Sequence, residues 1–198
     1  MVQDSVYIYN KFSPISYDLW CYIRKIVDFV ADNWHLKDHG TCGLRHLDRG
    51  FASYLVLGGE GMWEVRGGKQ HFVYSKVMMW VCLDRGVRLA DKYSKSALNK
   101  DKWQRSRDQL YEVRSLVGML GPGSNRLLTA RNNVQEIMEK GYDQKIQSFV
   151  MHYGCDTLDA ATLILPLVFF ISPTDPRMLA TIKCIDRSPD KVRELFFH

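Results

Sequence analysis

The run Val77-Met78-Met79-Trp80-Val81-Cys82-Leu83 decides the fold, because it is apolar on every side of a helical wheel. It lies inside a longer helical pattern that extends from residue 72 to residue 89. A helix without a polar stripe is usually buried on all sides. The sequence therefore predicts a central helix over residues 72–89 that other elements cover.

An amphipathic helix is predicted over residues 15–30. Its apolar residues recur every three or four positions, and its charged residues take the opposite face. Pro14 precedes this helix, and Ser16 and Asp18 supply an oxygen acceptor and a negative charge near its start. One helix with a polar face and one without indicate two concentric layers, as in a toroid of paired helices.

Two more helices follow from the same kind of pattern. Residues 103–113 are expected to form an exposed helix. Residues 134–140 are expected to form a short helix, with Gly141 as its C-terminal cap.

The last third of the chain combines a hairpin with further helices. Alternating residues at 149–153 predict a brief strand or hairpin arm. Asp156 and Asp159 are both expected to act as helix caps, Asp156 for the next helix, and Asp175-Pro176 is expected to begin the helix after it. The fold class is therefore all-α.

Two stretches fit neither a helical nor a strand pattern. Residues 39–59 contain five glycines around an apolar patch, and residues 114–133 contain a turn-forming stretch followed by a basic run. Irregular loops this long are uncommon in compact domains. We expect both stretches to be inserts in an otherwise helical domain.

Length and composition suit one folded domain. The chain has 198 residues, of which 46% are hydrophobic and 25% charged. Its 27 basic and 22 acidic residues give a net charge of +5 and are mostly interspersed. The densest basic stretch, residues 92–107, could follow a nucleic-acid backbone or form a solvated helix end. The aspartates within and beside it favour the second interpretation, so we expect no nucleic-acid partner.

The cysteines and the apolar runs bear on the expected cellular location of the protein. The five cysteines are dispersed, without a CxxC pair or a histidine at a zinc-like spacing. We therefore expect no metal site, no cofactor and no disulfide framework, which suits a reducing cytoplasm. The N-terminal residues do not resemble a secretory signal, and the longest apolar run, residues 163–171, is far shorter than the ~20 residues that span a bilayer. We expect a cytoplasmic protein without a membrane anchor.

The motif Trp63-Glu64-Val65-Arg66-Gly67 stands just ahead of the central helix and is the leading candidate for chemistry. A carboxylate between a large aromatic side chain and a guanidinium is the arrangement that a sugar-cleaving site needs. The competing interpretation is a surface carboxylate that pairs with Arg66 or Lys69, a common arrangement that contributes little to stability.

An ordered series of motifs resembles glycoside hydrolase family 15, in particular its glucoamylase-like and trehalase-like branch. The motifs that carry this resemblance are Trp63–Gly67, Gln70–Lys76, Trp80-Val81 and Asp84-Arg85-Gly86, supported by Pro14–Trp20, Gly141-Tyr142-Asp143, Leu165–Phe170 and Asp175-Pro176-Arg177. Together they cover most of the chain, and their order makes the resemblance more specific than any one motif.

The resemblance implies an (α/α)6 toroid that hydrolyses a terminal α-glucosidic bond with inversion. Inverting hydrolysis needs one carboxyl group as general acid and a second as general base. By motif position, Glu64 matches the general acid. Trp63 would wall the sugar site and keep Glu64 protonated by desolvation, and Arg66 could hydrogen-bond sugar hydroxyl groups.

Four residues near this motif have structural alternatives. For Tyr74 and Trp80, packing in the core is favoured over stacking on a sugar. For His71 and Lys76, a structural or supporting role is favoured over a catalytic one.

The chain also departs from the family pattern. Nothing after Arg187 matches the family's general base, and about half of the helices of a complete toroid are expected. We therefore predict one incomplete domain over residues 1–198, with 39–59 and 114–133 as inserts outside the family pattern and 188–198 as a divergent tail. Our hypothesis is that the inserts are translated non-coding sequence.

The expected function is that of an inverting α-glucosidase of the glucan 1,4-α-glucosidase or α,α-trehalase type. It would act on an α-glucoside or a trehalose-like carbohydrate, here as a fragment that lacks its general base. The alternative is a non-catalytic helical module that binds a sugar or a protein. An incomplete toroid would expose the apolar sides of its inner helices, which predicts self-association.

Overall fold

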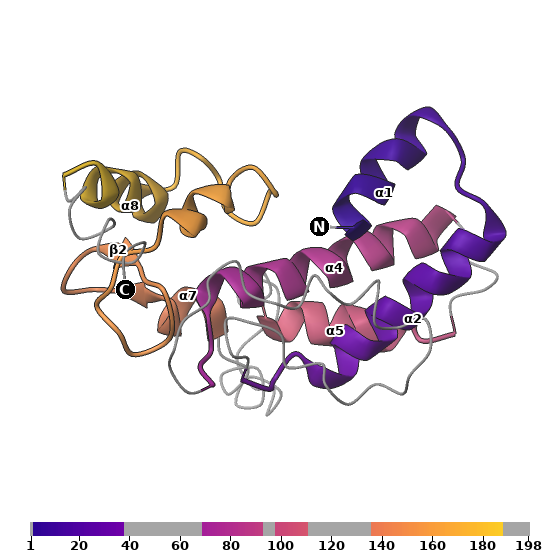
Figure 1. Ribbon diagram of the computed structural model, residues 1–198, viewed down its shortest axis with the longest axis horizontal. Coiled ribbons are helices and arrows are strands. Elements are labelled where there is room, and N and C mark those ends of the chain that lie inside the picture. The colour runs from indigo at the N-terminus through magenta and orange to yellow at the C-terminus, as the bar shows by residue number, and fades with distance from the viewer. Residues whose placement is uncertain (1, 38–68, 93–97, 111–135, 188–198) are drawn as a thin grey trace, which may run out of the picture.

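The computed structural model describes residues 2–37, 69–92, 98–110 and 136–187 (Figure 1). These residues are mostly helical, and the sheet among them has two short antiparallel strands. The helices are α1 (Val2–Phe12), α2 (Tyr17–Asn33), α4 (Val73–Lys92), α5 (Lys100–Leu110), α7 (Glu136–Lys140), the 3₁₀ helix η4 (Ala160–Ile164) and α8 (Pro176–Arg187). The all-α prediction is confirmed. The predicted inserts and tail lie outside the described residues and stay predictions.

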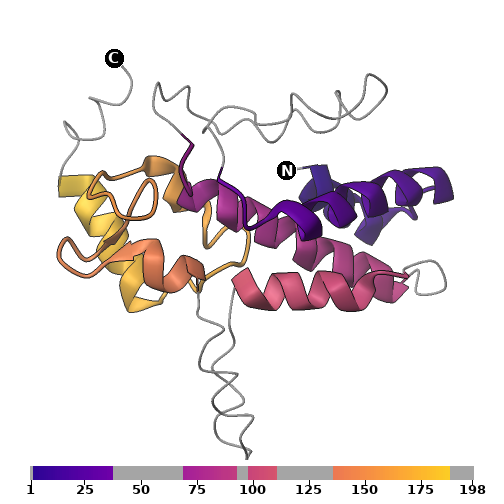
Figure 2. The same cartoon turned by 90° about the horizontal axis from the view of Figure 1, so that it is seen from below.

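Helix α4 is the central element, as its apolar run predicts. It contacts α1, α2, α5, α7 and η4, and most of its side chains are buried. Figure 2 shows α2 on one side of α4 and α5 on the other. When neighbouring elements cover a helix that lacks a polar stripe, its apolar surface is removed from water. This burial stabilises the fold by ~25 cal/mol per Å² of apolar surface.

Helix α2 supplies one of the covering layers. Ser16 is its N-cap, and the Ser16 hydroxyl accepts a hydrogen bond of 3.2 Å from the backbone N–H of Leu19. Its buried face consists of Trp20, Ile23, Val27 and Ala31. The amphipathic helix predicted from the sequence is confirmed, with its start two residues later.

Helix α5 is less exposed than the sequence suggests. Trp103 is fully buried and makes an edge-to-face contact with Trp20, with 6.3 Å between ring centroids. Its indole N–H donates a hydrogen bond of 2.7 Å to Asp28 Oδ1. The prediction of an exposed helix is wrong on this side, because a few apolar residues in a polar helix suffice to seat it on α2 and α4.

Carboxylates of the same chain pair with the basic stretch around α5. Lys100 pairs with Asp91, Lys102 with Asp32, and Arg107 with Asp108. These pairs support the interpretation of a solvated helix face.

The C-terminal described residues gather around the N-terminal end of α4 (Figure 1). Strands β1 (Tyr142–Asp143) and β2 (Ser148–Phe149) form a hairpin, with Tyr142 opposite Phe149. The strand predicted at 149–153 coincides with β2 only at Phe149, and beyond it Val150 and His152 form isolated bridges. Asp159, rather than Asp156, caps the next helix, because its carboxylate accepts a hydrogen bond of 2.8 Å from the Ala161 N–H. At the start of α8, Asp175 Oδ1 accepts from the Arg177 N–H at 2.9 Å, as predicted.

No helix within the described ranges combines the length and the apolar character needed to cross a bilayer.

Candidate functional site

The predicted site residues Trp63, Glu64 and Arg66 lie outside the described residues. The described chain resumes at Lys69, immediately before α4. The part of the site that the structure describes is therefore the start of α4 and the segment that packs on it.

Residues 150–159 pack on the start of α4, although about 80 residues of sequence lie between them. Phe72 and His152 form an antiparallel bridge, and the backbone N–H of Val73 donates to the Met151 carbonyl at 3.0 Å. A second bridge, between Val150 and Leu158, closes the segment on itself. The backbone around the start of α4 is thus held by hydrogen bonds from a distant part of the chain.

His71 and Tyr153 are the polar side chains that this packing brings together. Their rings stack with 5.4 Å between centroids and an interplanar angle of 30°. His71 Nδ1 and Tyr153 Oη are buried and have no hydrogen-bond partner among the described residues. Burial, with the positive charge of Lys76 next in importance, lowers the pKa of His71, so its imidazole is neutral at neutral pH. Burial also raises the pKa of Tyr153 far above its ordinary range.

Lys76 and Trp80 have the structural roles that the sequence favours. Lys76 is buried, and its ammonium group donates to the carbonyl oxygens of Trp34 and Leu36, the latter at 3.1 Å. Trp80 packs edge to face on Phe170, with 5.2 Å between ring centroids. Both side chains therefore hold α4 to neighbouring segments.

Tyr74 is half-buried and is the second residue of α4. Burial raises the pKa of its phenol, and the negative charge of Asp159 raises it further. Asp159 is itself buried and serves as the cap of η4. The sequence identifies Asp159 only as a cap and misses its proximity to Tyr74.

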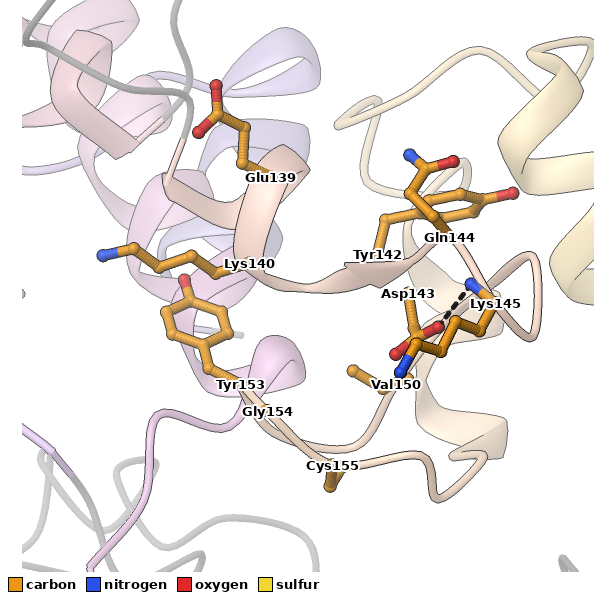
Figure 3. A pocket seen from close by; sticks show the side chains of 10 residues that line it. All are labelled: Glu139, Lys140, Tyr142, Asp143, Gln144, Lys145, Val150, Tyr153, Gly154 and Cys155. Carbon is orange, nitrogen blue, oxygen red and sulfur yellow. Dashed lines mark hydrogen bonds between the residues drawn. The ribbon is translucent and has the colours of Figure 1, made fainter.

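A hollow of about 580 Å³ opens beside this region, between α7, the β1–β2 hairpin and the turn at 153–155 (Figure 3). The residues that line it are Glu139, Lys140, Tyr142, Asp143, Gln144, Lys145, Val150, Tyr153, Gly154 and Cys155. The charges of its two acidic and two basic side chains sum to zero. Within the described ranges, histidine, cysteine and acidic side chains do not gather in threes as a metal ion would require.

Comparison with known proteins places the chain among the glycoside hydrolases. Residues 52–194 match the family model described as Glycosyl hydrolases family 15, and the chain belongs to that family. The match includes Trp63, Glu64 and Arg66 and continues through the described C-terminal residues. No solved structure matches the chain.

Several relatives of the chain are named trehalases. The chain is 29% identical to the trehalase of Mycobacterium tuberculosis over 185 residues, which are 93% of this chain and 20% of that protein. It is 30% identical to trehalase 1 of Sulfolobus acidocaldarius over 92% of this chain and 23% of the relative. The trehalase of Thermoplasma volcanium is 31% identical over 64% of this chain. The chain spans about a fifth of the length of these relatives.

Proposed function

We propose that this chain carries the general acid of an inverting α-glucosidase, of the α,α-trehalase or glucan 1,4-α-glucosidase type, and that Glu64 is this acid. The observation that carries the proposal is the family match over residues 52–194, which contains the Glu64 motif. The trehalases among the relatives favour trehalose or a similar α-glucoside as substrate.

Chain connectivity supports a site at the start of α4. Glu64 precedes Lys69 by five residues. Because an extended chain covers at most ~3.6 Å per residue, the two Cα atoms lie within about 18 Å of each other.

In the proposed reaction, Glu64 protonates the glycosidic oxygen as the bond to the anomeric carbon breaks. Trp63 would exclude water from Glu64 and keep its pKa high, and Arg66 would bind sugar hydroxyl groups. A second carboxylate must activate the attacking water from the opposite face of the sugar. This chain offers no matching base, so we propose that it acts slowly by itself on natural α-glucosides.

The experiment replaces the missing base with azide, an external nucleophile. Azide would attack the anomeric carbon while Glu64 gives its proton to the leaving oxygen, so that trehalose yields β-glucosyl azide and glucose. We expect the 198-residue chain to form this product, and Glu64→Gln to lower the rate roughly 10²- to 10⁴-fold, the range for a lost general acid. Nuclear magnetic resonance identifies the β-anomer.

A second substrate provides the control. The nitrophenolate of 4-nitrophenyl α-glucoside leaves without needing an acid, so its azide-dependent cleavage should survive Glu64→Gln. Equal rates for the chain and Glu64→Gln on trehalose would refute the acid role.

Two further properties belong to the same proposal. The described residues include large apolar side chains that are exposed, among them Phe12 at 86% and Phe169 at 80%, which supports self-association. Sedimentation that shows a monomer across a wide concentration range would refute it. The dispersed cysteines support a cytoplasmic location, which fractionation of the source cells can test.

A further inference from the structure

The hydroxyl group of Tyr153 makes no hydrogen bond within the described part of the chain. The Tyr153 ring lines the hollow, and Tyr153 Oη is buried without a hydrogen-bond partner among the described residues. A buried polar atom without a partner costs about 1–3 kcal/mol, and such atoms in native proteins call for an explanation. Tyr142 lines the same hollow, but its hydroxyl lies 3.4 Å from Gln147 Oε1.

The Tyr153 ring is fixed in place from two directions. Its backbone N–H donates a hydrogen bond of 3.1 Å to the His71 carbonyl, and its ring stacks on the His71 imidazole at 5.4 Å. A fixed ring presents its hydroxyl at a defined position, so a ligand that bonds to it does not have to order the side chain first.

Lys140 lies beside the Tyr153 hydroxyl at the edge of the hollow. Figure 3 shows the Lys140 side chain running beside this hydroxyl, whereas the Tyr142 hydroxyl points away from both. Lys140 Nζ lies 6.0 Å from the centroid of the Tyr153 ring, at the outer limit of a cation–π contact, and Lys140 is exposed. Such a side chain can swing into solvent at little cost and uncover the hydroxyl.

The lining of the hollow suits a neutral, hydroxyl-rich ligand. Glu139 and Asp143 balance Lys140 and Lys145, so neither an anion nor a cation is favoured overall. The Tyr153 phenol keeps its proton over the whole physiological range because burial raises its pKa, and it can therefore donate as well as accept. A sugar hydroxyl group has the same dual capacity.

We propose that Tyr153 is a sugar-binding residue, whose hydroxyl bonds to a hydroxyl group of a bound α-glucoside in the hollow once Lys140 moves aside. His71 is the positioning residue that holds the Tyr153 ring. This inference rests on the proposed function for the choice of ligand but requires nothing of Glu64.

The test measures binding of trehalose to the 198-residue chain by calorimetric titration, with Tyr153→Phe as the variant and Tyr142→Phe as the matched control. Loss of one hydrogen bond should weaken binding about three- to tenfold in Tyr153→Phe. Tyr142→Phe should bind like the parent chain. The melting temperature of Tyr153→Phe should not fall, because the removed hydroxyl has no partner within the described residues.

Three results would overturn the inference: equal affinity in Tyr153→Phe and the parent chain, equal weakening in Tyr142→Phe, or no trehalose binding by the parent chain. A lower melting temperature with unchanged affinity would show that the hydroxyl serves a partner within the protein. If Tyr153→Phe weakens binding while Glu64→Gln leaves azide-dependent turnover unchanged, the binding role stands and the general-acid role falls. The reverse pair of results refutes Tyr153 alone.

A second variant covers the case in which Tyr153→Phe does not fold. Lys140→Ala should bind trehalose at least as tightly as the parent chain, since it removes the cover. Added trehalose should shift the backbone amide resonances of Tyr153, Gly154 and Cys155 most strongly. Weaker binding by Lys140→Ala, or shifts confined to other parts of the chain, would refute the proposal.

Discussion

Arg85 Nη2 donates a hydrogen bond of 3.0 Å to the carbonyl oxygen of Val168, although 83 residues separate them in sequence. The same guanidinium lies 2.6 Å from Asp84 Oδ2 and 2.7 Å from Asp4 Oδ1. Arg88 adds a bond of 2.8 Å to the Asp84 carboxylate. One buried cation therefore ties α4 to α1 and to the turn that follows η4.

Removal of the Arg85 charge should be strongly destabilising. Arg85 and Asp84 are only 3% and 5% exposed at their side chains, so Arg85→Met removes a buried charge partner of Asp84 and the Arg85 hydrogen bond to the Val168 carbonyl. We expect a loss of about 3–5 kcal/mol in the free energy of unfolding, measured with urea. The control Lys102→Met breaks the exposed pair with Asp32 and should cost less than about 1 kcal/mol. A similar small cost in both variants would contradict the assigned role.

Gly86 sets how closely α2 approaches α4. A Cβ atom at position 86 would lie 2.7 Å from Val27 Cγ1 and 2.8 Å from Val27 Cγ2, and Val27 is fully buried. Gly86→Ala gains about 1 kcal/mol of helix propensity but loses about 1–3 kcal/mol to overpacking. We expect a net destabilisation of roughly 1 kcal/mol.

The double variant Gly86→Ala with Val27→Ala separates these effects. Removal of the Val27 methyl groups makes room for the new Cβ, so the two changes should couple favourably by at least about 1 kcal/mol in a double-mutant cycle. Additive costs in urea unfolding would show that the two side chains do not compete for space.

Phe169 has a left-handed backbone, with φ of 60°, and its side chain is 80% exposed. This conformation costs a residue with a Cβ about 1–2 kcal/mol, more than the entropy that glycine adds to the unfolded chain. Phe169→Gly should therefore raise the free energy of unfolding by roughly 0.5–1 kcal/mol. Leu167→Gly is the matched control, since Leu167 is also exposed but has a negative φ, and it should destabilise. Destabilisation by both glycines would contradict the strain argument.

His71 should make stability depend on pH. Its pKa in the folded protein is lowered, so below about pH 6.5 the unfolded chain binds a proton that the folded chain resists. Stability contributed by neutral His71 is thus present near pH 7 and falls as the pH drops toward its lowered pKa. The charged groups around it are Lys76, Glu136, Lys37 and Lys140, of which only Glu136 favours the proton.

Urea unfolding at pH 7 and pH 5 provides the measurement. The parent chain should lose more stability between the two pH values than His71→Gln, whose side chain does not titrate. Identical losses would show that other groups cause the pH dependence.

Local sequence patterns were enough to predict much of this fold. The apolar run at 77–83 marked α4 as buried, Ser16 marked the start of α2, and Asp175-Pro176 marked the start of α8. These predictions succeed because helix burial and capping depend on residues within a few positions of one another.

The errors occurred where contacts are not local. Asp156 and Asp159 both have the chemistry of a cap, and only the course of the backbone selects Asp159. The polar neighbours of Trp103 predict an exposed helix, yet α2 covers the Trp103 side chain. The candidate site follows the same division: the sequence motif makes Glu64 the candidate acid, whereas the contact between Tyr153 and His71 cannot be predicted from the sequence.

Residue order alone thus accounts for the positions of the main helices, the family and the candidate acid. Folding in three dimensions selected which distant groups meet: Tyr153 with His71, Arg85 with Val168, and Gly86 with Val27. The physical reason is that helix periodicity and capping are short-range properties. Stacking, buried ion pairs and close packing depend instead on how whole elements approach each other, which no local pattern in a single sequence encodes.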